Sequence, residues 1–545
     1  MGLLMNIKNI INKDKVGNHH IDKVYNFDVI DYYYRYKKDK DSDIISDKTI
    51  DDIDFYEVYK YIDYTKSTVG QQFYFNKLLT TNHNNNNFDE QEEWIDYLSN
   101  NHDIRTLIQD IISRINSNES YRIPNLFLDE YVSKPKYFYI LKLLVILPLI
   151  LFLLTFISSG FYFLMAFSIV INLILHYKNK KYIYLYKDSI PELLNLHKCA
   201  KDLYDLDILK NDIHLLSSIK SIDRIKSRMF VFKIEKVGDS DIFEIFFLIV
   251  EYIKIVFLLE PLIVFNVLDK LNEKKDDIKK LFDYVGKIDS YISILSMREK
   301  IEYYCIPEVL NKNKTLKFVD IYHPLILNCV PNTLEIERKS VLLTGSNMAG
   351  KTTFIRSVAL NVLLAQTINT CFAKEFKFCP MKLYSAIRIS DDLLNDKSYY
   401  FEEVMTIKDM IVQSRKQCGH LFLLDEIFKG TNTIERISAG KAVLSYLTKS
   451  DNNIVFVSTH DVELTDLLES EYDLYHFTEV IKNNQIHFDY KLKKGYLSTR
   501  NAIRILEINN YPQEIIADAR ETSVIIKHYS KNIQLKIDNN ENSAY

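Results

Sequence analysis

The most informative segment of the sequence reads Val341-Leu342-Leu343-Thr344-Gly345-Ser346-Asn347-Met348-Ala349-Gly350-Lys351-Thr352-Thr353. Its first four residues predict a buried strand, and the helical pattern of residues 354–364 follows directly. Between them stands GxxxxGK[ST], in the strand–loop–helix setting that a phosphate-binding loop requires. The glycines let backbone N–H groups converge on a phosphate, and the helix N-terminus adds its dipole. The segment therefore predicts an α/β domain that binds a nucleotide.

Each position of this loop has an expected role toward ATP and Mg²⁺. The expected cofactor-binding residues are Gly345, Ser346, Asn347, Met348, Ala349, Gly350, Lys351, Thr352 and Thr353. Lys351 is expected to reach the β- and γ-phosphates, and Thr352 to hold the metal ion. The sequence contains only 12 Gly in 545 residues, well below the usual frequency of about 7%. Such a glycine-dependent motif is therefore hard to attribute to chance.

Two later apolar runs end in polar residues that suit the same site. The run His420–Leu424 is followed by Asp425-Glu426, and Ile454–Val457 is followed by Ser458-Thr459-His460-Asp461. Asp425 would act through Mg²⁺, and Glu426 would position or deprotonate the attacking water. His460 would hydrogen-bond to the γ-phosphate. We therefore predict Glu426, His460 and Lys351 as catalytic residues, and Thr352 and Asp425 as metal ligands.

The overall composition excludes several classes of protein. There are 69 Lys and Arg against 73 Asp and Glu, so the formal net charge is −4 and a strongly basic nucleic-acid footprint is absent. The 6 cysteines form no CxxC pair, which argues against a zinc site and suggests a reducing compartment. The length allows about two to four domains and a large core.

A long uncharged stretch predicts a helical hairpin in a membrane. No charged side chain occurs from Leu143 to Leu175, and Ser158-Ser159-Gly160 gives a turn signal at its centre. Two helices, about 139–157 and 161–177, fit a hydrocarbon core of ~30 Å better than one helix of ~50 Å. The flanks carry Lys134, Lys136, Lys178, Lys180 and Lys181. These lysines favour both ends on the cytoplasmic side and the turn across the bilayer. The alternative is a buried helix pair in a soluble domain.

The rest of the chain divides into a helical middle and an α/β C-terminal part. The segments 51–79, 88–116, 190–225 and 271–304 have helical periodicity. The apolar stretch from Ile242 to Leu268 carries four charged residues at helical intervals, so we expect a long buried helix of a soluble domain there. From about residue 315, short apolar runs alternate with helices, which is typical of a parallel α/β sheet.

The chain resembles the MutS mismatch-repair ATPases. The nucleotide loop with its Asn347-Met348, the run Leu423–Thr433 and Ser458–Asp461 carry this resemblance. Further similar segments are Ser390–Leu393, Ser398–Val404, Tyr511–Ile516 and, near the start, Tyr64–Gly70 with Phe75–Leu79. The resemblance is specific over about 315–525, and looser over about 50–130 and 182–305.

The resemblance implies an all-α core and lever domain followed by an α/β P-loop (ABC-type) ATPase domain. Together with the transmembrane hairpin expected from the uncharged stretch, which interrupts the helical domain, it predicts a multidomain chain. We expect a charged N-terminal segment (1–49), a first core part (50–133), the hairpin (134–181), a second core and lever part (182–310), the ATPase domain (311–527) and a polar tail (528–545). The ATPase domain would lie on the cytoplasmic or nucleoplasmic side of the membrane.

The resemblance also implies a homodimer through the ATPase domain. In the family, a loop after the acidic pair reaches the partner's nucleotide, and residues 430–433 match this loop. Asn432 stands where the family usually has serine, so we include it among the cofactor-binding residues, with an amide in place of a hydroxyl. The positions nearest to the family's adenine-stacking aromatic residue hold Cys329 and Val330.

Two functions follow from these observations. The family's usual role is ATP-gated DNA binding in mismatch repair or recombination. However, only about fifty residues precede the core-like segment, so we expect the family's mismatch-reading domain to be missing. Phe55 and Glu57 resemble its Phe-x-Glu motif, but we expect them to begin an amphipathic helix. The lysines of 274–280 alternate with acids, as on a solvated helix face. The alternative function is a membrane-associated mechanoenzyme that acts on a protein partner.

Overall fold

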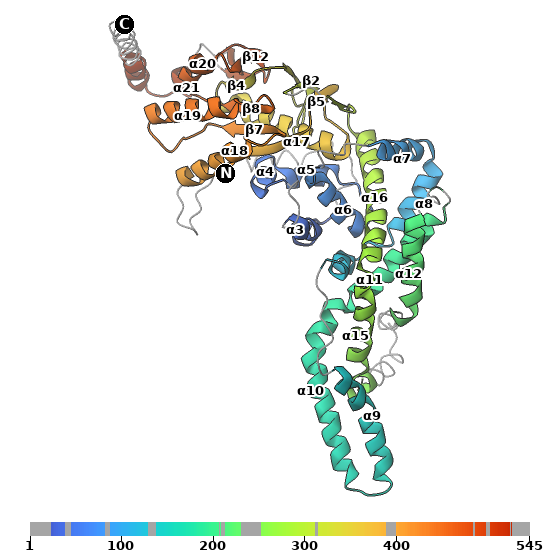
Figure 1. The fold of residues 1–545 in the computed structure, drawn as a ribbon. Coiled ribbons are helices and arrows are strands. Elements are labelled where there is room, and N and C mark those ends of the chain that lie inside the picture. Colours follow the sequence, from blue (N-terminus) through green and yellow to red (C-terminus); the bar gives the residue numbers. More distant parts are fainter. Residues whose placement is uncertain are drawn as a thin grey trace. The chain divides into compact units, whose positions relative to one another are not determined.

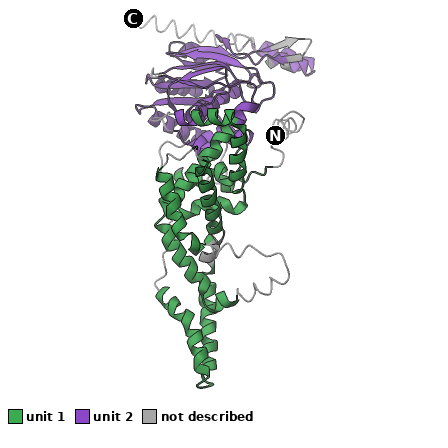
Figure 2. Cartoon of the chain, turned by 90° about the vertical axis from the view of Figure 1, so that its right-hand side faces the viewer, with its two compact units in different colours: residues 1–41, 63–76, 93–295 green, residues 42–62, 77–92, 296–545 purple. Residues whose placement is uncertain are grey.

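The computed structural model describes residues 23–38, 45–81, 88–128, 138–206, 208, 213–229, 252–310, 314–388, 399–482, 485–496, 502–523 and 525. The chain divides into two compact units, coloured separately in Figure 2. Unit 1 comprises Met1–Asp41, Asp63–Asn76 and Glu93–Leu295, and unit 2 comprises Ser42–Ile62, Lys77–Glu92 and Ser296–Tyr545. Each unit therefore combines segments that are far apart in the sequence.

The described elements of unit 1 are helices. They are α2 (Phe27–Ile30), α3 (Tyr32–Lys38), α6 (Thr68–Leu79), α7 (Asp89–Asn100), α8 (His102–Ile112), η1 (Asn118–Leu126), α9 (Phe138–Thr155), α10 (Phe161–Lys187), α11 (Ser189–Tyr204), α12 (Ile213–Met229), α15 (Leu259–Asn272) and α16 (Lys275–Lys300). Helices α6, α7 and α16 cross a boundary of the unit along the chain. Helix α11 packs against η1, α8 and α12 (Figure 1). The predicted all-α middle of the chain is thus present among the described residues.

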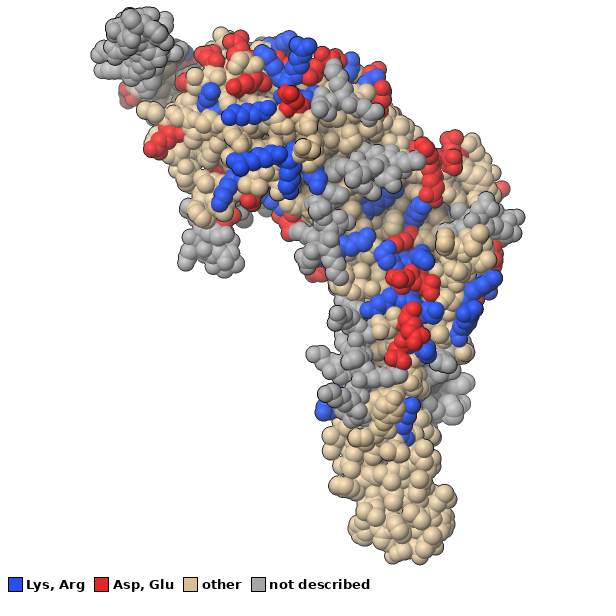
Figure 3. Space-filling model, viewed as in Figure 1, with Lys and Arg blue, Asp and Glu red and all other residues tan. Residues whose placement is uncertain are grey.

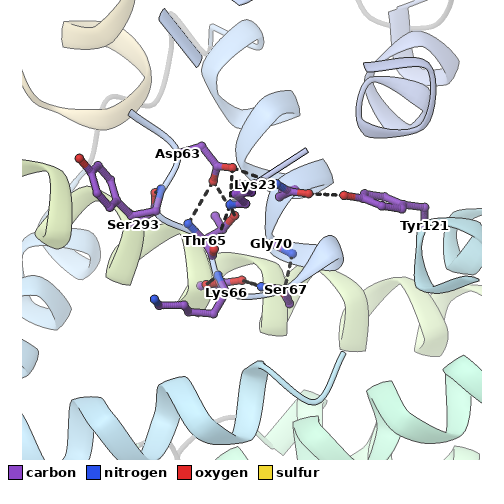
Figure 4. A network of polar contacts seen from close by, with 11 residues as sticks. Lys23, Asp63, Thr65, Lys66, Ser67, Gly70, Tyr121 and Ser293 are labelled. Atoms are coloured by element: carbon purple, nitrogen blue, oxygen red, sulfur yellow. Dashed lines mark hydrogen bonds and ion pairs between the residues drawn. The ribbon is translucent and has the colours of Figure 1, made fainter. Parts of the chain in front are cut away.

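A buried carboxylate holds the start of α6 against α16. Asp289 of α16 is fully buried and accepts hydrogen bonds from the backbone N–H groups of Lys66 and Ser67, each at 2.8 Å, and from Ser67 Oγ at 2.7 Å. Ser67 Oγ in turn accepts the N–H of Gly70 at 2.8 Å (Figure 4). A Cβ on Gly70 would lie 1.9 Å from Asp289 Oδ2, so this approach needs glycine.

Asp63 forms a second buried centre in the same network. Its carboxylate accepts Lys23 Nζ at 2.6 Å, the N–H of Thr65 at 3.0 Å and Gln71 Nε2 at 3.0 Å (Figure 4). In the bond to Thr65, the Asp63 side chain accepts the N–H two residues later, which forms an Asx-turn. It separates the helix that ends at Ile62 from α6. The segment 51–79, which we expected to be helical, is therefore divided into several helices.

Helices α9 and α10 form the predicted hairpin, with the turn at Ser158–Gly160 and with α10 continuing to Lys187 (Figure 1). By length and composition, Phe138–Thr155 and Phe161–Lys180 could each cross a membrane, with mean hydropathies of 2.6 and 1.5. Only 22% and 17% of these windows is buried, which differs from a helix in the core of a soluble domain. Lys134 and Lys136 lie outside the described residues.

The expected long helix at 242–268 is interrupted where it is described. Residues 252–256 are helical, Leu258 has a left-handed φ of 48°, and α15 begins at Leu259. Residues 242–251 lie outside the described part of the chain. Leu258 is buried with Phe138, Leu141 and Phe265, and this cluster packs α9 against α15. Leu258, the residue at which the helix is interrupted, is therefore also part of the core.

Unit 2 contains three sheets. The largest has the order β12-β9-β4-β8-β7-β6. Its strands are β4 (Ser340–Thr344), β6 (Met381–Ala386), β7 (Gly419–Asp425), β8 (Asn453–Ser458), β9 (Tyr472–His476) and β12 (Lys493–Lys494). All neighbouring pairs are parallel except β12 with β9. Strands β4 and β8 are buried at every position, as expected for central strands that are covered on both faces.

Smaller elements complete the unit. A mixed sheet has the order β1-β5-β2-β3, formed by Glu308–Val309, Glu375–Phe378, Leu316–Ile321 and Asn332–Ile336. A hairpin joins β10 (Glu479–Lys482) to β11 (Gln485–Phe488). The helices are α4 (Asp47–Asp52), α5 (Phe55–Ile62), η2 (Asn347–Ala349), α17 (Lys351–Ile368), α18 (Tyr399–Gln413), α19 (Thr433–Leu447), α20 (Glu463–Leu468) and α21 (Ala502–Ile508). The chain thus combines a helix-rich unit 1 with an α/β unit 2.

The residues that resemble the Phe-x-Glu motif, Phe55 and Glu57, lie in α5. Phe55 is fully buried at the first position of the helix, so its ring cannot stack on a nucleic-acid base in this fold. Glu57 instead pairs with Lys60 on the helix surface, at 2.7 Å. The amphipathic helix start that we expected is confirmed. The preceding Asp54 forms ion pairs with Arg356 and Arg388.

Candidate active site

The candidate site lies at the carboxyl ends of the central parallel strands. Strand β4 leads into Gly345–Gly350, β7 ends at Asp425, and β8 ends at Ser458. These ends are neighbours because β8 pairs with both β4 and β7. In an open α/β sheet, ligands bind at this edge. The sheet order therefore brings together the three segments that the sequence identified.

The loop after β4 needs its two glycines for backbone reasons. Gly345 has φ of 132°, and a Cβ there would lie 2.4 Å from the carbonyl oxygen of Phe477. Gly350 has φ of 103° and directly precedes α17. Both angles are costly for residues with a Cβ. The loop can therefore turn its backbone N–H groups toward the start of α17, where the helix dipole favours an anion.

Lys351 is buried inside this loop. Its side chain is 1% exposed, and Nζ donates a hydrogen bond to the carbonyl oxygen of Gly345 at 2.6 Å. Burial lowers the pKa of Lys351 to about 8, although the carboxylates of Asp425 and Glu426 oppose this shift. An anionic phosphate placed beside the ammonium group would favour its charged form. The lysine is thus fixed where a phosphate would rest on the loop.

Thr352 and Asp425 form the candidate metal site. Thr352 Oγ1 donates to Asp425 Oδ2 at 2.7 Å, and Ser458 Oγ donates to Asp425 Oδ1. A hydroxyl and a carboxylate are the hard oxygen ligands that Mg²⁺ prefers, and this ion usually takes few protein ligands together with phosphates and water. The residues present therefore fit Mg²⁺ bound with a nucleotide.

Glu426 has an unusual backbone and a strongly acidic side chain. Its φ of 54° is left-handed, a costly conformation for glutamate that is frequent at functional sites. Oε1 lies 2.8 Å from His460 Nε2, and Oε2 lies 2.9 Å from Lys429 Nζ. Burial alone would raise the pKa of Glu426, but the hydrogen bonds from His460 and Lys429 outweigh it and lower the pKa to about 2. The carboxylate is therefore ionised at neutral pH.

The remaining loop residues differ in their exposure. Ser346 Oγ donates to Glu479 Oε2 at 3.1 Å, Met348 is 68% exposed, and Ala349 is buried. Thr353 is half-buried, and its carbonyl oxygen accepts Ser357 Oγ inside α17. The side chain of Asn347 is not among those described. The similar segment Ser390–Leu393 and Ser398 also lie outside the described residues.

Asn432 caps a helix. Its Oδ1 accepts the N–H of Glu435 at 3.0 Å, and Asn432 is the N-cap of α19. Asparagine and serine are about equally good at this position, so either residue would keep the helix start. The amide –NH₂ of Asn432 does not serve in this cap. Within one subunit, the structure therefore gives Asn432 a structural role that leaves its donor group available.

Sequence reasoning missed four residues of this region: Lys429, Ser458 as a partner of Asp425, Glu479 and Tyr490. A Cβ on Gly350 would lie 3.3 Å from the ring of Tyr490, so this aromatic ring lies beside the loop. Glu479 begins the β10–β11 hairpin. Glu479 lies in a short strand and Tyr490 just after β11, both more than a hundred positions after the loop, and no motif in the sequence connects them to it. Lys429 could have been found, because it lies three residues after Glu426. Ser458 could have been found, because it ends β8.

Comparison with known proteins finds similarity to one family over part of the chain. Residues 341–527 match the family described as MutS domain V. The chain is 29% identical over 332 residues to a protein named DNA mismatch repair protein MutS from Lysinibacillus sphaericus, covering 58% of this chain and 37% of the relative. It is 32% identical over 273 residues to the protein of the same name from Pseudothermotoga lettingae, covering 48% of this chain and 33% of the relative.

These alignments span about a third of the length of the curated relatives. The matched family region begins inside β4 and includes the loop, the acidic pair, His460 and Asn432. Domain V of MutS is an α/β ATPase domain, in agreement with the parallel sheet of unit 2. Over residues 341–527, the chain is therefore similar to domain V of the MutS family, at modest identity to the curated relatives.

Proposed function

We propose that this protein is a Mg²⁺-dependent ATPase of the MutS type, with residues 311–527 as a P-loop, ABC-type ATPase domain. The observation that carries this proposal is the contact between Thr352 and Asp425, 2.7 Å apart, beside the buried Lys351. Phosphate binding explains why a lysine is buried in a loop, and metal binding explains why a hydroxyl faces a carboxylate.

The mechanism follows from the roles that these groups can fill. The N–H groups of residues 345–350 and the ammonium group of Lys351 bind the β- and γ-phosphates. Thr352 and Asp425 would hold Mg²⁺, which when bound would supply positive charge beside the phosphates. Glu426 orients the attacking water and accepts its proton, while His460 keeps the carboxylate in place and reaches the γ-phosphate. The products are ADP and phosphate.

The test uses Lys351→Ala, with Lys416→Ala as a control on the surface of the same unit. Nucleotide binding is measured with a fluorescent ATP analogue, and turnover by phosphate release with Mg²⁺. We expect Lys351→Ala to lose both activities and the control to keep them, because only Lys351 lies in the loop. Unchanged ATP binding and turnover in Lys351→Ala would refute the proposal.

We further propose that the protein works as a homodimer and is tethered to a membrane by residues 139–177. The dimer is supported by the match of residues 430–433 to the loop that reaches the partner's nucleotide in the family. The tether is supported by residues 143–175, which carry no Asp, Glu, Lys or Arg, and by the largely exposed surface of α9 and α10. The nucleotide state would then open or close the helical arms of the dimer, with the ATPase domains on the cytoplasmic or nucleoplasmic side.

DNA is the first candidate for what the dimer binds, because the relatives are named DNA mismatch repair proteins. A protein partner at the membrane is the second candidate, and the apolar hairpin favours it. The segment 274–280 favours neither, because Lys274 and Lys279 pair with Asp277 and Asp283 on α16.

A salt series separates the two candidates. Binding of the detergent-purified protein to homoduplex and mismatched DNA is measured at increasing salt concentrations. Phosphate contacts release counterions, so DNA binding must weaken steeply as salt rises. Such a slope supports the first candidate, and tighter binding of the mismatch would add mismatch recognition. The absence of binding, or binding that does not depend on salt, supports the second.

A further inference from the structure

Lysine–tyrosine pairs mark one level of the hairpin on both of its helices. On α9, the ammonium group of Lys142 lies over the rings of Phe138 and Tyr139, at 5.3 and 5.6 Å. On α10, the ammonium group of Lys180 lies over the ring of Tyr177, at 5.0 Å. Tyr139 and Tyr177 are 76% and 74% exposed. We call Tyr139, Lys142, Tyr177 and Lys180 the basal belt.

The two tyrosines of the belt lie at the same height, as one hydrogen bond between the helices indicates. Asn172 Nδ2 donates to the carbonyl oxygen of Leu144 at 3.1 Å, so these two residues face each other. Tyr139 precedes Leu144 by 5 residues and Tyr177 follows Asn172 by 5 residues (144 − 139 = 177 − 172). Because the helices are antiparallel, the two tyrosines are level. Exposed tyrosines at one level, with lysines one turn away, are typical of a membrane–water interface.

The hairpin beyond the belt presents an apolar surface. Residues 143–175 carry no Asp, Glu, Lys or Arg. On the face drawn in Figure 3, the tip of the hairpin accordingly shows no blue or red residues. Exposed apolar side chains occur on both helices and next to the turn, including Leu143, Leu153, Phe156, Ile157, Phe163 and Phe167. An exposed apolar surface of this extent usually contacts a partner or a membrane. The basal belt next to it indicates a lipid bilayer.

Most backbone N–H groups around the turn donate hydrogen bonds to nearby carbonyl oxygens. The N–H groups of Phe156 and Ile157 donate to the carbonyls of Leu153 and Leu154, and those of Phe161 and Tyr162 donate to Ser158 and Ser159. Within lipid, an unpaired backbone group costs several kcal/mol, whereas a turn in water has no such need. These bonds reduce the number of N–H groups that the turn would leave unpaired within lipid.

A hydrogen bond between the two helices also pairs a carbonyl oxygen that a proline leaves without its helical partner. Pro148 has no N–H, so the carbonyl oxygen of Leu144, four residues earlier, loses its helical partner. Asn172 supplies the missing donor from α10. The same Nδ2 also donates to the carbonyl oxygen of Val256 at 2.7 Å. Pairing of freed carbonyls by a neighbouring helix is the arrangement expected in a bilayer.

The length of the hairpin decides how far it reaches. From Tyr139 to Ile157 and from Phe161 to Tyr177, the helical rise of 1.5 Å per residue gives ~27 Å and ~24 Å. A hydrocarbon core is ~30 Å thick, and tyrosines prefer the headgroup level outside it. Any tilt shortens the reach further. With the basal belt at one interface, the turn ends before the opposite headgroups.

We propose that α9 and α10 insert as a re-entrant hairpin from one face of a lipid bilayer, with the basal belt at the headgroups and the Ser158–Gly160 turn inside the hydrocarbon. This inference rests on the proposed membrane tether and adds its depth and topology. It replaces our expectation from the sequence that the turn crosses to the far side. The protein then enters and leaves the membrane on the same face.

The test places a thiol at the turn of the full-length protein. Ser159→Cys, with Ser158→Cys as a second variant, is reconstituted into phosphatidylcholine–phosphatidylglycerol vesicles. A membrane-impermeant maleimide is added outside, or trapped inside, and labelling is repeated after detergent. Ser217→Cys on the exposed side of α12 is the matched control, and the parent protein with its six cysteines gives the background. Flotation of the vesicles reports membrane binding separately.

We expect the turn cysteine to label at least about tenfold more slowly than Ser217→Cys from either side, and to label fully in detergent, because the hydrocarbon excludes a charged reagent. Labelling by the trapped reagent would show that the turn crosses the bilayer and would overturn the proposed depth. Rapid labelling from outside with normal flotation would also overturn the proposed depth. Rapid labelling without flotation would overturn the tether itself.

Discussion

Glu426 shows how a single residue joins the fold to the chemistry. Strand β7 ends at Asp425, and the left-handed φ of Glu426 turns the chain sharply, so that successive carboxylates point to different partners. Asp425 faces Thr352, whereas Glu426 faces His460 and Lys429. The N–H of Glu426 donates to the carbonyl of Ser458 at 2.9 Å, which helps to hold the strained turn. One acid is thus directed to the metal and the next to the water.

Replacement of Glu426 by glutamine should separate ATP binding from hydrolysis. Glutamine keeps the shape of the side chain but cannot accept a proton from water. We expect Glu426→Gln to bind ATP as tightly as the parent protein and to hydrolyse it at least about a hundredfold more slowly, the loss typical of a missing general base. Single-turnover measurements give both quantities. A hydrolysis rate within a factor of about two of the parent rate would remove Glu426 from the mechanism.

The pH dependence of hydrolysis should respond to Lys429. The pKa of Glu426 lies at about 2, below its ordinary value, so the carboxylate stays ionised until the pH falls far into the acid range. Lys429→Ala removes one of the two hydrogen bonds that lower this pKa. We therefore expect the acid limb of the pH–rate profile to move to higher pH, while Lys416→Ala leaves it in place. A shift to lower pH, or none, would contradict this role of Lys429.

At the scale of elements, the junction of α6 and α16 should depend on pH. Burial raises the pKa of Asp289 to about 6, although the N–H groups of Lys66 and Ser67 partly oppose the shift. The folded pKa exceeds the ordinary value of 3.8, so the contribution to stability is present below pH 3.8 and is lost as pH rises through about 6. We expect amides of α6 to exchange hydrogen faster at pH 7.5 than at pH 5, after correction for the intrinsic rate. Asp289→Asn should abolish this difference.

The same junction gives a steric prediction. Gly70→Ala would place a Cβ 1.9 Å from Asp289 Oδ2, and neither α6 nor α16 can move without breaking the hydrogen bonds between them. We expect this variant to lose about 2–4 kcal/mol of stability, as for a disrupted buried network. Denaturant unfolding followed by tyrosine fluorescence measures the loss. Ser217→Ala, on the exposed face of α12, should change it little, and equal stability of the two variants would show that the junction tolerates the methyl group.

The sequence predicted elements best where the side-chain pattern is local. The loop at 345–353 and the acidic pair were predicted from the GxxxxGK[ST] motif and from apolar runs that end in polar residues. Their meeting at the carboxyl ends of one sheet follows from the strand order that the structure shows. The divisions within 51–79 were missed, because Asp63 ends a helix through its own side chain while the apolar pattern continues around it. The β10–β11 hairpin, which brings Glu479 to Ser346, depends on contacts between distant segments that no local pattern records.

At the scale of the whole molecule, the proposed dimer would make each active site a shared property of two chains. Asn432 caps α19 with its carbonyl oxygen and has its amide hydrogens left to donate. In the proposed dimer, this amide would reach the nucleotide held by the partner's loop. Each active site would then combine Lys351 of one subunit with Asn432 of the other. A symmetric dimer has two such composite sites.

A mixing experiment tests this arrangement. Lys351→Ala subunits cannot bind ATP but carry an intact Asn432 loop, whereas Asn432→Ala subunits bind ATP but lack the donor. Random mixing makes half of the dimers mixed, and each mixed dimer holds one intact composite site, so about a quarter of the parent activity should return. Asn432→Ser keeps the helix cap and should remain active alone, which separates the loss of a donor from the loss of the cap. If Asn432 acted only within its own subunit, the mixture would be no more active than its two components.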